Sequence, residues 1–171
     1  NVENTDYSSG NFIDTAFTAA EQSAILQTDV INEDNPRYGT EGGDDTRDRV
    51  YLLSIAEVSD VSYGFNSEFD TSSKTRVSIN TAYTDRKSEL DSIGSAGLWW
   101  LRSSGFFGDS ASGVDNNGCG EDYYSTVSLT VGVRPVIHLN LSFTNLWSHA
   151  GTVSAEDESR INGSFVGSLK G

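Results

Sequence analysis

The sequence predicts an α+β domain in which two or more short helices precede short strands and long loops. Three observations carry this prediction: a helical period near the N-terminus, strand-like aromatic and β-branched segments mainly from residue 98 onward, and intervening stretches rich in Gly, Asn, Asp and Ser. A chain of 171 residues is long enough to bury a core. Because neither a repeat nor a linker is visible, we expect one domain over residues 1–171.

The first third of the chain predicts two short helices. In TAFTAAEQSAILQ (residues 15–27) the apolar residues fall on one helical face, and Thr18 and Glu21 have the spacing of a capping box. We expect this helix to end close to the last residue of the segment. Ser54 and Glu57 repeat the capping-box spacing at the start of the segment IAEVSD, which predicts the second helix.

Four segments have strand patterns. RVYLLS (49–54) is typical of a short buried strand, and LWWLRS (98–103) is rich in aromatic β-formers. SASGVDNNGCG (110–120) predicts a strand that enters a turn at its Asn-Gly pair. GVRPVIHLNLS (132–142) predicts a strand with Pro135 at its start, on an edge or at a bulge.

The charge of the chain excludes some classes of partner. It has 25 Asp and Glu against 11 Lys and Arg, a net charge of −14. Nucleic acid and anionic membranes repel such a chain, so we expect neither as a partner. No apolar run is long enough to span a bilayer, and we expect no direct membrane insertion. The chain neither begins with Met nor contains one, which is compatible with a removed secretion signal.

The acidic segment 33–48 raises the question of calcium binding. Its carboxylates could supply oxygen ligands, but the spacing of an EF-hand is absent. We favour a solvated loop whose carboxylates cap turns or pair with arginines, and we leave calcium binding open. The acidic residues concerned are Asp34, Glu41, Asp44, Asp45 and Asp48, and the arginines are Arg47 and Arg49.

No residue pattern points to catalysis. Cys119 is the only cysteine, and its acidic neighbours should raise rather than lower the pKa of its thiol. We interpret it as an incidental loop thiol. A nucleophile elbow and a phosphate-binding glycine loop are both absent from the sequence. We therefore predict no enzyme, no catalytic residues, no metal site and no cofactor.

Residues 106–131 have the composition of a recognition loop. Phe, Tyr, Asp, Asn, Ser, Thr and Gly dominate, and such loops use Tyr for contact area and small polar residues for hydrogen bonds. Composition supports an alternative equally well, namely that the aromatic residues cap the core. We assign structural roles to the residues of the flanking strand patterns, namely Trp99, Trp100, Arg102 and Arg134.

Two motifs carry a family resemblance. WWLRSSG (99–105) and GVRPVIHLN (132–140) resemble the W-W-L-R-S-P-G and G-V-R-P pattern of the bacterial DUF6273 domain, with Ser104 in place of the usual proline. NFIDTAFTAAEQSAIL, GGDDTRDRVYLLSIAEV and LWSHAGTV resemble further blocks of that family. The similarity spans most of the chain.

The resemblance implies a C-type lectin-like fold, in the branch of formylglycine-generating enzymes, with a small twisted antiparallel sheet and long ligand-facing loops. Those enzymes use a pair of cysteines, so the resemblance does not imply their activity here. Similar domains begin with a further tryptophan-containing block, so we expect this chain to lack its N-terminal portion.

Some members of the family resemble variable proteins of diversity-generating retroelements. Their randomised adenine-containing codons cannot become Lys, Glu, Gln, Met or Trp codons, and between residues 106 and 131 only Glu121 departs from that restriction. We therefore predict a variable ligand-binding site at about residues 106–130. Its candidate contacts are Phe106, Phe107, Asp109, Ser110, Gly113, Asp115, Asn116, Asn117, Cys119, Asp122, Tyr123, Tyr124, Ser125, Thr126, Ser128 and Thr130.

These expectations together describe an extracellular or cell-surface binding module of bacterial origin. A protein is the first choice of partner and a glycan the second. The alternatives are a structural subunit of a cell-surface assembly, in which the same segment packs against another copy, and an enzyme of the formylglycine-generating branch.

Overall fold

The computed structural model describes residues 10–81, 95–122 and 126–143. The chain divides into two compact units. The first unit contains Gln27–Ile137, and the second contains the described residues on either side, 10–26 and 138–143.

The second unit holds two short helices and a pair of short strands. Helix α1 (Phe12–Ala16) is capped by Asn11, and helix α2 (Ala19–Ala24) begins with the predicted capping box of Thr18 and Glu21. Strands β1 (Ile25–Leu26) and β8 (His138–Leu139) pair antiparallel. The predicted single helix over 15–27 is wrong in extent, because Phe17 has extended backbone and because residues 25 and 26 join a strand pair.

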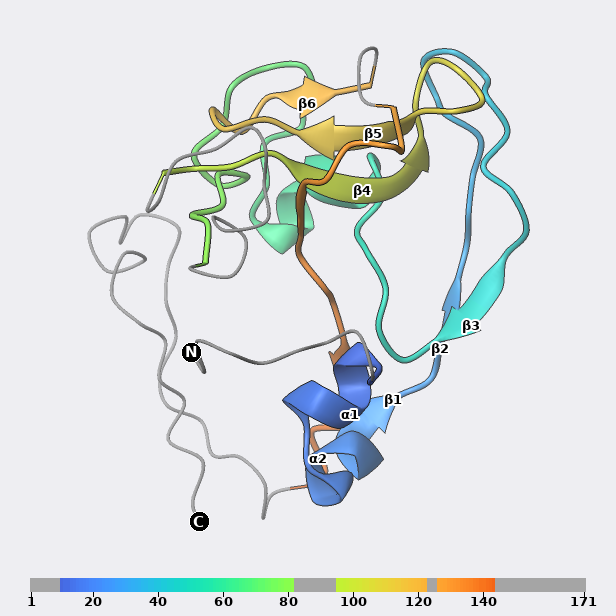
Figure 1. The fold of residues 1–171 in the computed structure, drawn as a ribbon, viewed down its shortest axis with the longest axis vertical. Coiled ribbons are helices and arrows are strands. Elements are labelled where there is room, and N and C mark those ends of the chain that lie inside the picture. Colours follow the sequence, from blue (N-terminus) through green and yellow to red (C-terminus); the bar gives the residue numbers. More distant parts are fainter. Residues whose placement is uncertain (1–9, 82–94, 123–125, 144–171) are drawn as a thin grey trace. The chain divides into compact units, whose positions relative to one another are not determined.

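The first unit is built on a four-stranded sheet with the order β6-β5-β4-β7 (Figure 1). Strand β4 (Trp99–Ser104) pairs antiparallel with β5 (Ala111–Val114), which pairs antiparallel with β6 (Gly120–Glu121). Strand β7 (Gly132–Val133) lies parallel to β4. The α+β class is confirmed, but the sheet is mixed rather than purely antiparallel.

The other pairings of this unit are short. Strands β2 (Thr28–Val30) and β3 (Thr46–Asp48) form a separate antiparallel pair (Figure 1). The acidic segment 33–48 forms most of the loop between them, but its last three residues belong to β3. Two 3₁₀ helices follow, η1 (Glu57–Ser59) and η2 (Val61–Tyr63). The predicted second helix is therefore only a 3₁₀ turn, although its Ser54–Glu57 capping box forms in both directions.

Two strand predictions are wrong in extent. Within RVYLLS only Tyr51 forms a bridge, to Val136. The predicted strand over 132–142 is divided into β7, that bridge and β8, each with a different partner. Pro135 lies between the first two pairings and has no N–H to donate, so a continuous ladder is broken there.

The core of the first unit lies under β4. Burial alternates along this strand, so that Trp99 and Leu101 face inward, as a pleated strand requires. They pack with Ile55, Val58, Phe69 and Val114, and Leu53 lies partly buried against them. Trp99 is 2% exposed, and its indole N–H donates to the Arg76 carbonyl over 3.1 Å. Trp100 points to the other face and is only partly buried.

A fully buried arginine organises the irregular part of this unit. The Arg76 guanidinium is 0% exposed and contacts no carboxylate among the described residues. It donates instead to backbone carbonyls, and burial lowers its pKa. These hydrogen bonds tie η1 and the loop after η2 to the turn between β5 and β6, where regular ladders are lacking. The carbonyls belong to Val58, Asn66, Glu68, Phe69, Thr71 and Gly118.

Candidate functional site

Three aromatic side chains form a cluster at the start of the predicted variable segment. We call Tyr38, Phe106 and Phe107 the ring cluster. The Tyr38 and Phe106 rings meet edge to face with centroids 4.6 Å apart, and Phe106 meets Phe107 in the same way at 4.6 Å. Phe107 is 50% exposed and Tyr38 is 38% exposed. The cluster is thus an ordered aromatic surface rather than a set of core residues.

A buried asparagine holds Tyr38 in place. The Asn35 amide donates to the Ser104 carbonyl over 2.7 Å, and its oxygen accepts from the backbone N–H groups of residues 37 and 38. Thr40 closes the loop by donating its hydroxyl to the Phe106 carbonyl. Because Asn35 is only 1% exposed and its side chain makes three hydrogen bonds, loop 35–40 is fixed against the end of β4.

Asp122 directly follows β6 and links loop 35–40 to the end of that strand. Its carboxylate accepts from Arg37 at 3.3 Å and from the Tyr38 hydroxyl at 3.4 Å, and its carbonyl accepts from the Phe106 N–H. Arg37 also pairs with Asp70, which is exposed. With 4% exposure, Asp122 supports the ring cluster from beneath. It is not an exposed contact, contrary to our expectation.

A turn beside the ring cluster extends the surface. The Ser110 hydroxyl accepts from the Phe107 N–H and donates to its carbonyl, which closes the turn over residues 107–110. Asp109 accepts from the Val127 N–H through its carbonyl, and Thr126 bridges Ser110. The Val127 side chain is 65% exposed. Val127 therefore adds one exposed apolar side chain beside this turn.

The turn between β5 and β6 presents a second, polar edge. The Asp115 carboxylate accepts from the backbone N–H groups of Asn117 and Cys119, both over 2.8 Å, and so fixes the turn. Burial raises the pKa of the Cys119 thiol, and the charges of Asp115 and Glu121 raise it further. The predicted direction is confirmed. A thiol held protonated is a poor nucleophile at neutral pH.

The candidate contacts divide by burial. Ser110, Gly113 and Asp122 are buried, so their inclusion as exposed contacts is corrected: each is enclosed by the sheet or by its own hydrogen bonds. Phe106, Asp115 and Cys119 are partly buried. Tyr123, Tyr124 and Ser125 lie outside the described residues. The exposed candidates are Phe107, Asp109, Asn116, Asn117, Thr126, Ser128 and Thr130.

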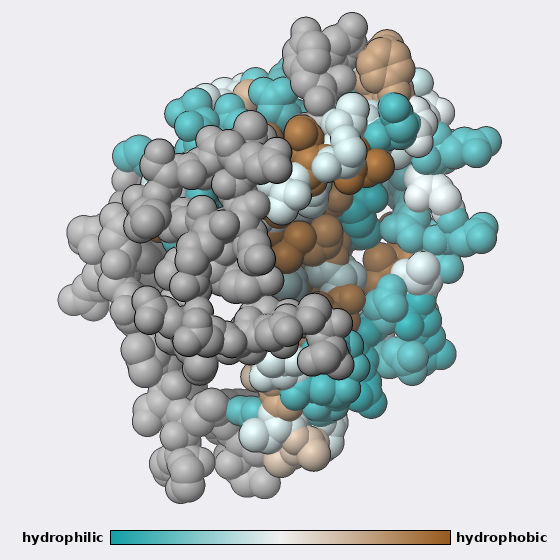
Figure 2. Space-filling view, in the orientation of Figure 1, coloured by the Kyte–Doolittle hydropathy of each residue, from teal (hydrophilic) through white to brown (hydrophobic). Residues whose placement is uncertain are grey.

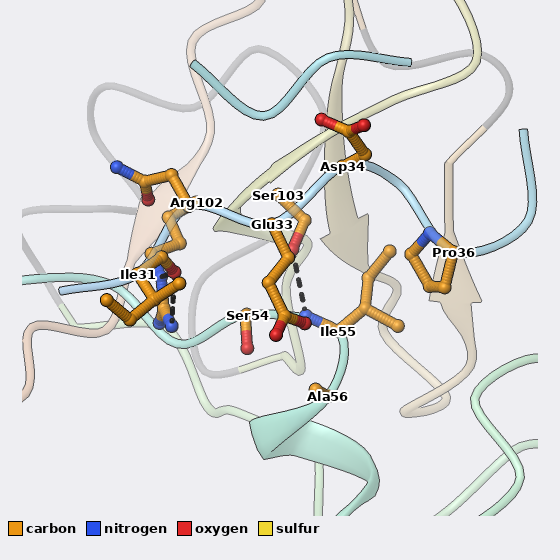
Figure 3. A pocket seen from close by; sticks show the side chains of 10 residues that line it. Ile31, Glu33, Asp34, Pro36, Ser54, Ile55, Ala56, Arg102 and Ser103 are labelled. Atoms are coloured by element: carbon orange, nitrogen blue, oxygen red, sulfur yellow. Dashed lines mark hydrogen bonds between the residues drawn. The ribbon is translucent and has the colours of Figure 1, made fainter. Parts of the chain in front are cut away.

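The arginine of β4 lines a different feature, an open pocket of about 200 Å³. Arg102 donates to the Leu52 and Ile31 carbonyls and pairs with Glu57, while Tyr51 lies 5.7 Å from its guanidinium. These contacts brace β4 against two loops. Glu33 points toward Ser54 in this pocket, and Asp34 points away (Figure 3).

Several carboxylates of the acidic loop are engaged in local hydrogen bonds. Asp34 accepts from the Gly42 N–H, Asp45 accepts from the Asn32 N–H, and Asp48 accepts from Thr46. Across residues 10–81, 95–122 and 126–143, no group of three or more His, Cys, Asp or Glu side chains is arranged to hold a metal ion. Hydrophilic residues cover much of the described surface in Figure 2.

Sequence reasoning missed the part of the site that lies before residue 106. Arg37 and Tyr38 join the surface through contacts to distant residues: Asp122 lies 85 and 84 positions away from them, and Asp70 lies 33 positions from Arg37. The one available signal was NPRYG, in which Asn35 and Pro36 mark a turn with an aromatic residue at its tip. That signal predicts a turn but does not predict which distant residues the turn contacts.

The described chain is an α+β domain with few short helices and small sheets. Residues 3–141 match the family described as "Domain of unknown function (DUF6273)", so the protein belongs to this family. The resemblance seen in the sequence is thereby confirmed at the level of the family. No curated protein and no solved structure matches the chain. Within the described residues, no helix has both the length and the apolar character needed to cross a membrane.

Proposed function

We propose that this domain is a binding module whose contact surface is the ring cluster together with the exposed residues of segment 106–130. One observation carries the proposal: Tyr38 and Phe107 are substantially exposed although the residues beneath them are fully hydrogen-bonded. Aromatic side chains held in this way offer contact area at little entropic cost. The Phe107 ring and the exposed side chains of segment 106–130 thus sit on a framework that other side chains hold together.

A protein is the partner that this surface fits best. Exposed rings and Val127 supply an apolar centre, and Asp70, Asp109 and Asn116 supply a polar surround. The net charge of −14 favours a partner whose facing surface is basic. The raised pKa of the Cys119 thiol gives no support to the alternative of an enzyme.

We further propose a C-type lectin-like fold, located at the bacterial cell surface or outside the cell. Two features support this fold: β1 and β8, from opposite ends of the described chain, pair with each other, and a small sheet carries long loops. The parallel pairing of β4 with β7 departs from the expected antiparallel sheet.

The proposal includes diversification of the segment by a retroelement. Its support is the restricted composition of residues 106–131 and the exposure of seven of the candidate contacts. Sequencing the neighbouring DNA tests this part. A reverse transcriptase gene and a near-copy of the segment's coding sequence that differs only at adenines are expected, and a locus without either contradicts diversification.

A displayed library tests the binding surface itself. Codons for Phe107, Asp109, Asn116, Asn117, Thr126 and Ser128 are randomised, and variants are selected against a basic protein such as lysozyme. A matched library randomises six exposed residues of unit one away from the segment: Asp29, Arg47, Ser62, Tyr63, Ser67 and Lys74. Binders should arise from the first library and not from the second. Equal yields from both would contradict the proposal.

The structural-subunit alternative has a specific observation in its favour, since exposed apolar rings also suit self-association. Light scattering after size-exclusion chromatography distinguishes the two. A monomer across a wide concentration range favours recognition of another molecule. A stable oligomer that Phe107→Ser dissociates favours self-assembly through this surface.

A further inference from the structure

A second arginine of the first unit has an unusual environment. The Arg134 guanidinium stacks over the Trp99 ring at 4.6 Å and donates one hydrogen bond, from Nη1 to the Arg76 carbonyl over 3.3 Å. Burial lowers the pKa of Arg134. Among the described residues, no carboxylate pairs with it and no acceptor meets its Nε or Nη2. Arg76, by contrast, has acceptors for each of its nitrogens.

A buried amide lies in the same place. The Asn80 Nδ2 atom is buried and has no hydrogen-bond partner. The side chain packs directly over Gly97, where any Cβ would overlap the amide group. The Asn80 amide is therefore held directly against the Gly97 backbone. Buried polar groups are nearly always paired, so the Asn80 amide makes this wall of the pocket unusually polar.

Both side chains line one small pocket. Its volume is about 50 Å³, and Ser78, Trp99 and Gly132 complete its wall. One water occupies ~10–15 Å³ on this scale, so the space holds a group of a few heavy atoms. Ile79 and Val133 also line it, and they are 55% and 58% exposed. The pocket thus has donors inside and apolar side chains toward solvent.

We propose that this pocket binds a carboxylate group, with Arg134 supplying both the charge and the donors. The planar guanidinium fork matches a carboxylate and leaves Nε and Nη2 for it, while Nη1 remains on the Arg76 carbonyl. Water could pair with the donors, but it would leave the positive charge uncompensated. A carboxylate joined to a small apolar group would also contact Ile79 and Val133.

The ligand can come from two sources, a free small acid or the C-terminus of a polypeptide. This proposal does not depend on the ring cluster, because the pocket shares none of its residues. Either one can fail without affecting the other.

The test uses the full chain and nuclear magnetic resonance. The Trp99 indole N–H and Arg134 Nη1 donate to the same Arg76 carbonyl, so a ligand on Arg134 should shift the Trp99 indole resonance. Its signal is identified by its loss in Trp99→Phe. Sodium acetate should give a saturable shift, and isobutyrate should saturate at a lower concentration. Sodium chloride at matched ionic strength should not.

The variants separate binding from folding. Arg134→Gln should weaken acetate binding by about tenfold or more, since it removes the charge and the donors that face the carboxylate. Arg47→Gln is the control, because Arg47 is exposed and pairs with Asp29. If Arg134→Gln does not fold, Arg134→Lys decides by the same measurement, because it keeps the charge but loses the planar fork. A linear shift, an equal response to chloride, or unchanged binding in the folded variants overturns the proposal.

Two peptides distinguish the sources. A saturable shift with trialanine, but not with trialanine amide, assigns the pocket to a polypeptide C-terminus. A shift with isobutyrate but with neither peptide assigns it to a small acid. Equal shifts with both peptides contradict carboxylate recognition.

Discussion

At the scale of single residues, the buried Arg76 and the partly buried Arg134 show how one type of side chain serves different roles. Arg76 replaces regular secondary structure: its guanidinium satisfies carbonyls of a loop that no strand pairs. Five donors in a fixed plane make arginine suited to this role, and lysine lacks that geometry. Arg134 donates from Nη1 to the Arg76 carbonyl, and its Nε and Nη2 atoms meet no acceptor among the described residues.

The first prediction concerns Arg76. Arg76→Met keeps the apolar volume but leaves several buried carbonyls without donors, so we expect it to lower the free energy of unfolding by about 4 kcal/mol or more. Urea denaturation followed by tryptophan fluorescence measures this change. The control Arg47→Met, at an exposed position, should change it by less than about 0.5 kcal/mol. Equal effects of the two substitutions would show that the carbonyl contacts contribute little.

The second prediction concerns the Cys119 thiol. Because its pKa is raised in the folded protein, the rate of alkylation by iodoacetamide should rise to its midpoint at a higher pH than in the peptide NGCGED. Asp115→Asn keeps the turn's acceptor but removes one charge, so it should move the midpoint down. A folded-state midpoint at or below that of the peptide would contradict the burial of this thiol.

The same shift has a consequence for stability. A raised folded-state pKa means that the folded protein holds the thiol proton more tightly than the unfolded chain does. The resulting stabilisation is complete below the unfolded pKa. It is lost as pH rises through the folded pKa, in the alkaline range.

At the scale of elements, features set by neighbours in sequence were predictable, and features set by distant partners were not. The Thr18–Glu21 and Ser54–Glu57 capping boxes and the strand at 98–103 depend on local patterns, and each forms. The division of 132–142 among three partners depends on tertiary packing. So does the parallel position of β7, since β-propensity does not specify a partner.

The third prediction concerns the turn between β5 and β6. Gly118 has φ +75°, and a Cβ there would overlap the Ser73 carbonyl, whereas Gly39 has φ +70° with open space around it. Gly39→Ala should therefore lose only about 1–2 kcal/mol of stability from backbone strain. Gly118→Ala should lose at least about 2 kcal/mol more, because the clash adds to the same strain. Equal losses in urea denaturation would mean that the turn moves freely away from Ser73.

At the scale of the whole molecule, the sequence predicted part of the candidate site. It placed the segment with exposed Phe107, Asp109 and Asn116, because its composition is unusual over a continuous stretch. It could not separate these from buried Ser110 and Asp122, since serine and aspartate occur on either side of a surface. Whether a polar side chain stabilises the fold or contacts a partner at the surface depends on its hydrogen bonds to distant loops.

The family match extends over both compact units. The central claim about the protein is that two groups of residues in the first unit have separate roles. Buried anchors set the fold, and exposed residues of segment 106–130 are free to change.

Thermal unfolding of two multiple variants tests this claim most directly. One variant replaces exposed residues, as Phe107→Ser, Asp109→Asn, Asn116→Ser, Asn117→Ser, Thr126→Ser and Ser128→Ala. The other replaces buried ones, as Ser110→Val, Gly113→Val and Asp122→Asn. We predict that the first lowers the midpoint by less than about 4 °C and the second by more than about 10 °C. A first variant that unfolds as readily as the second would contradict the account, because the exposed segment would then belong to the core.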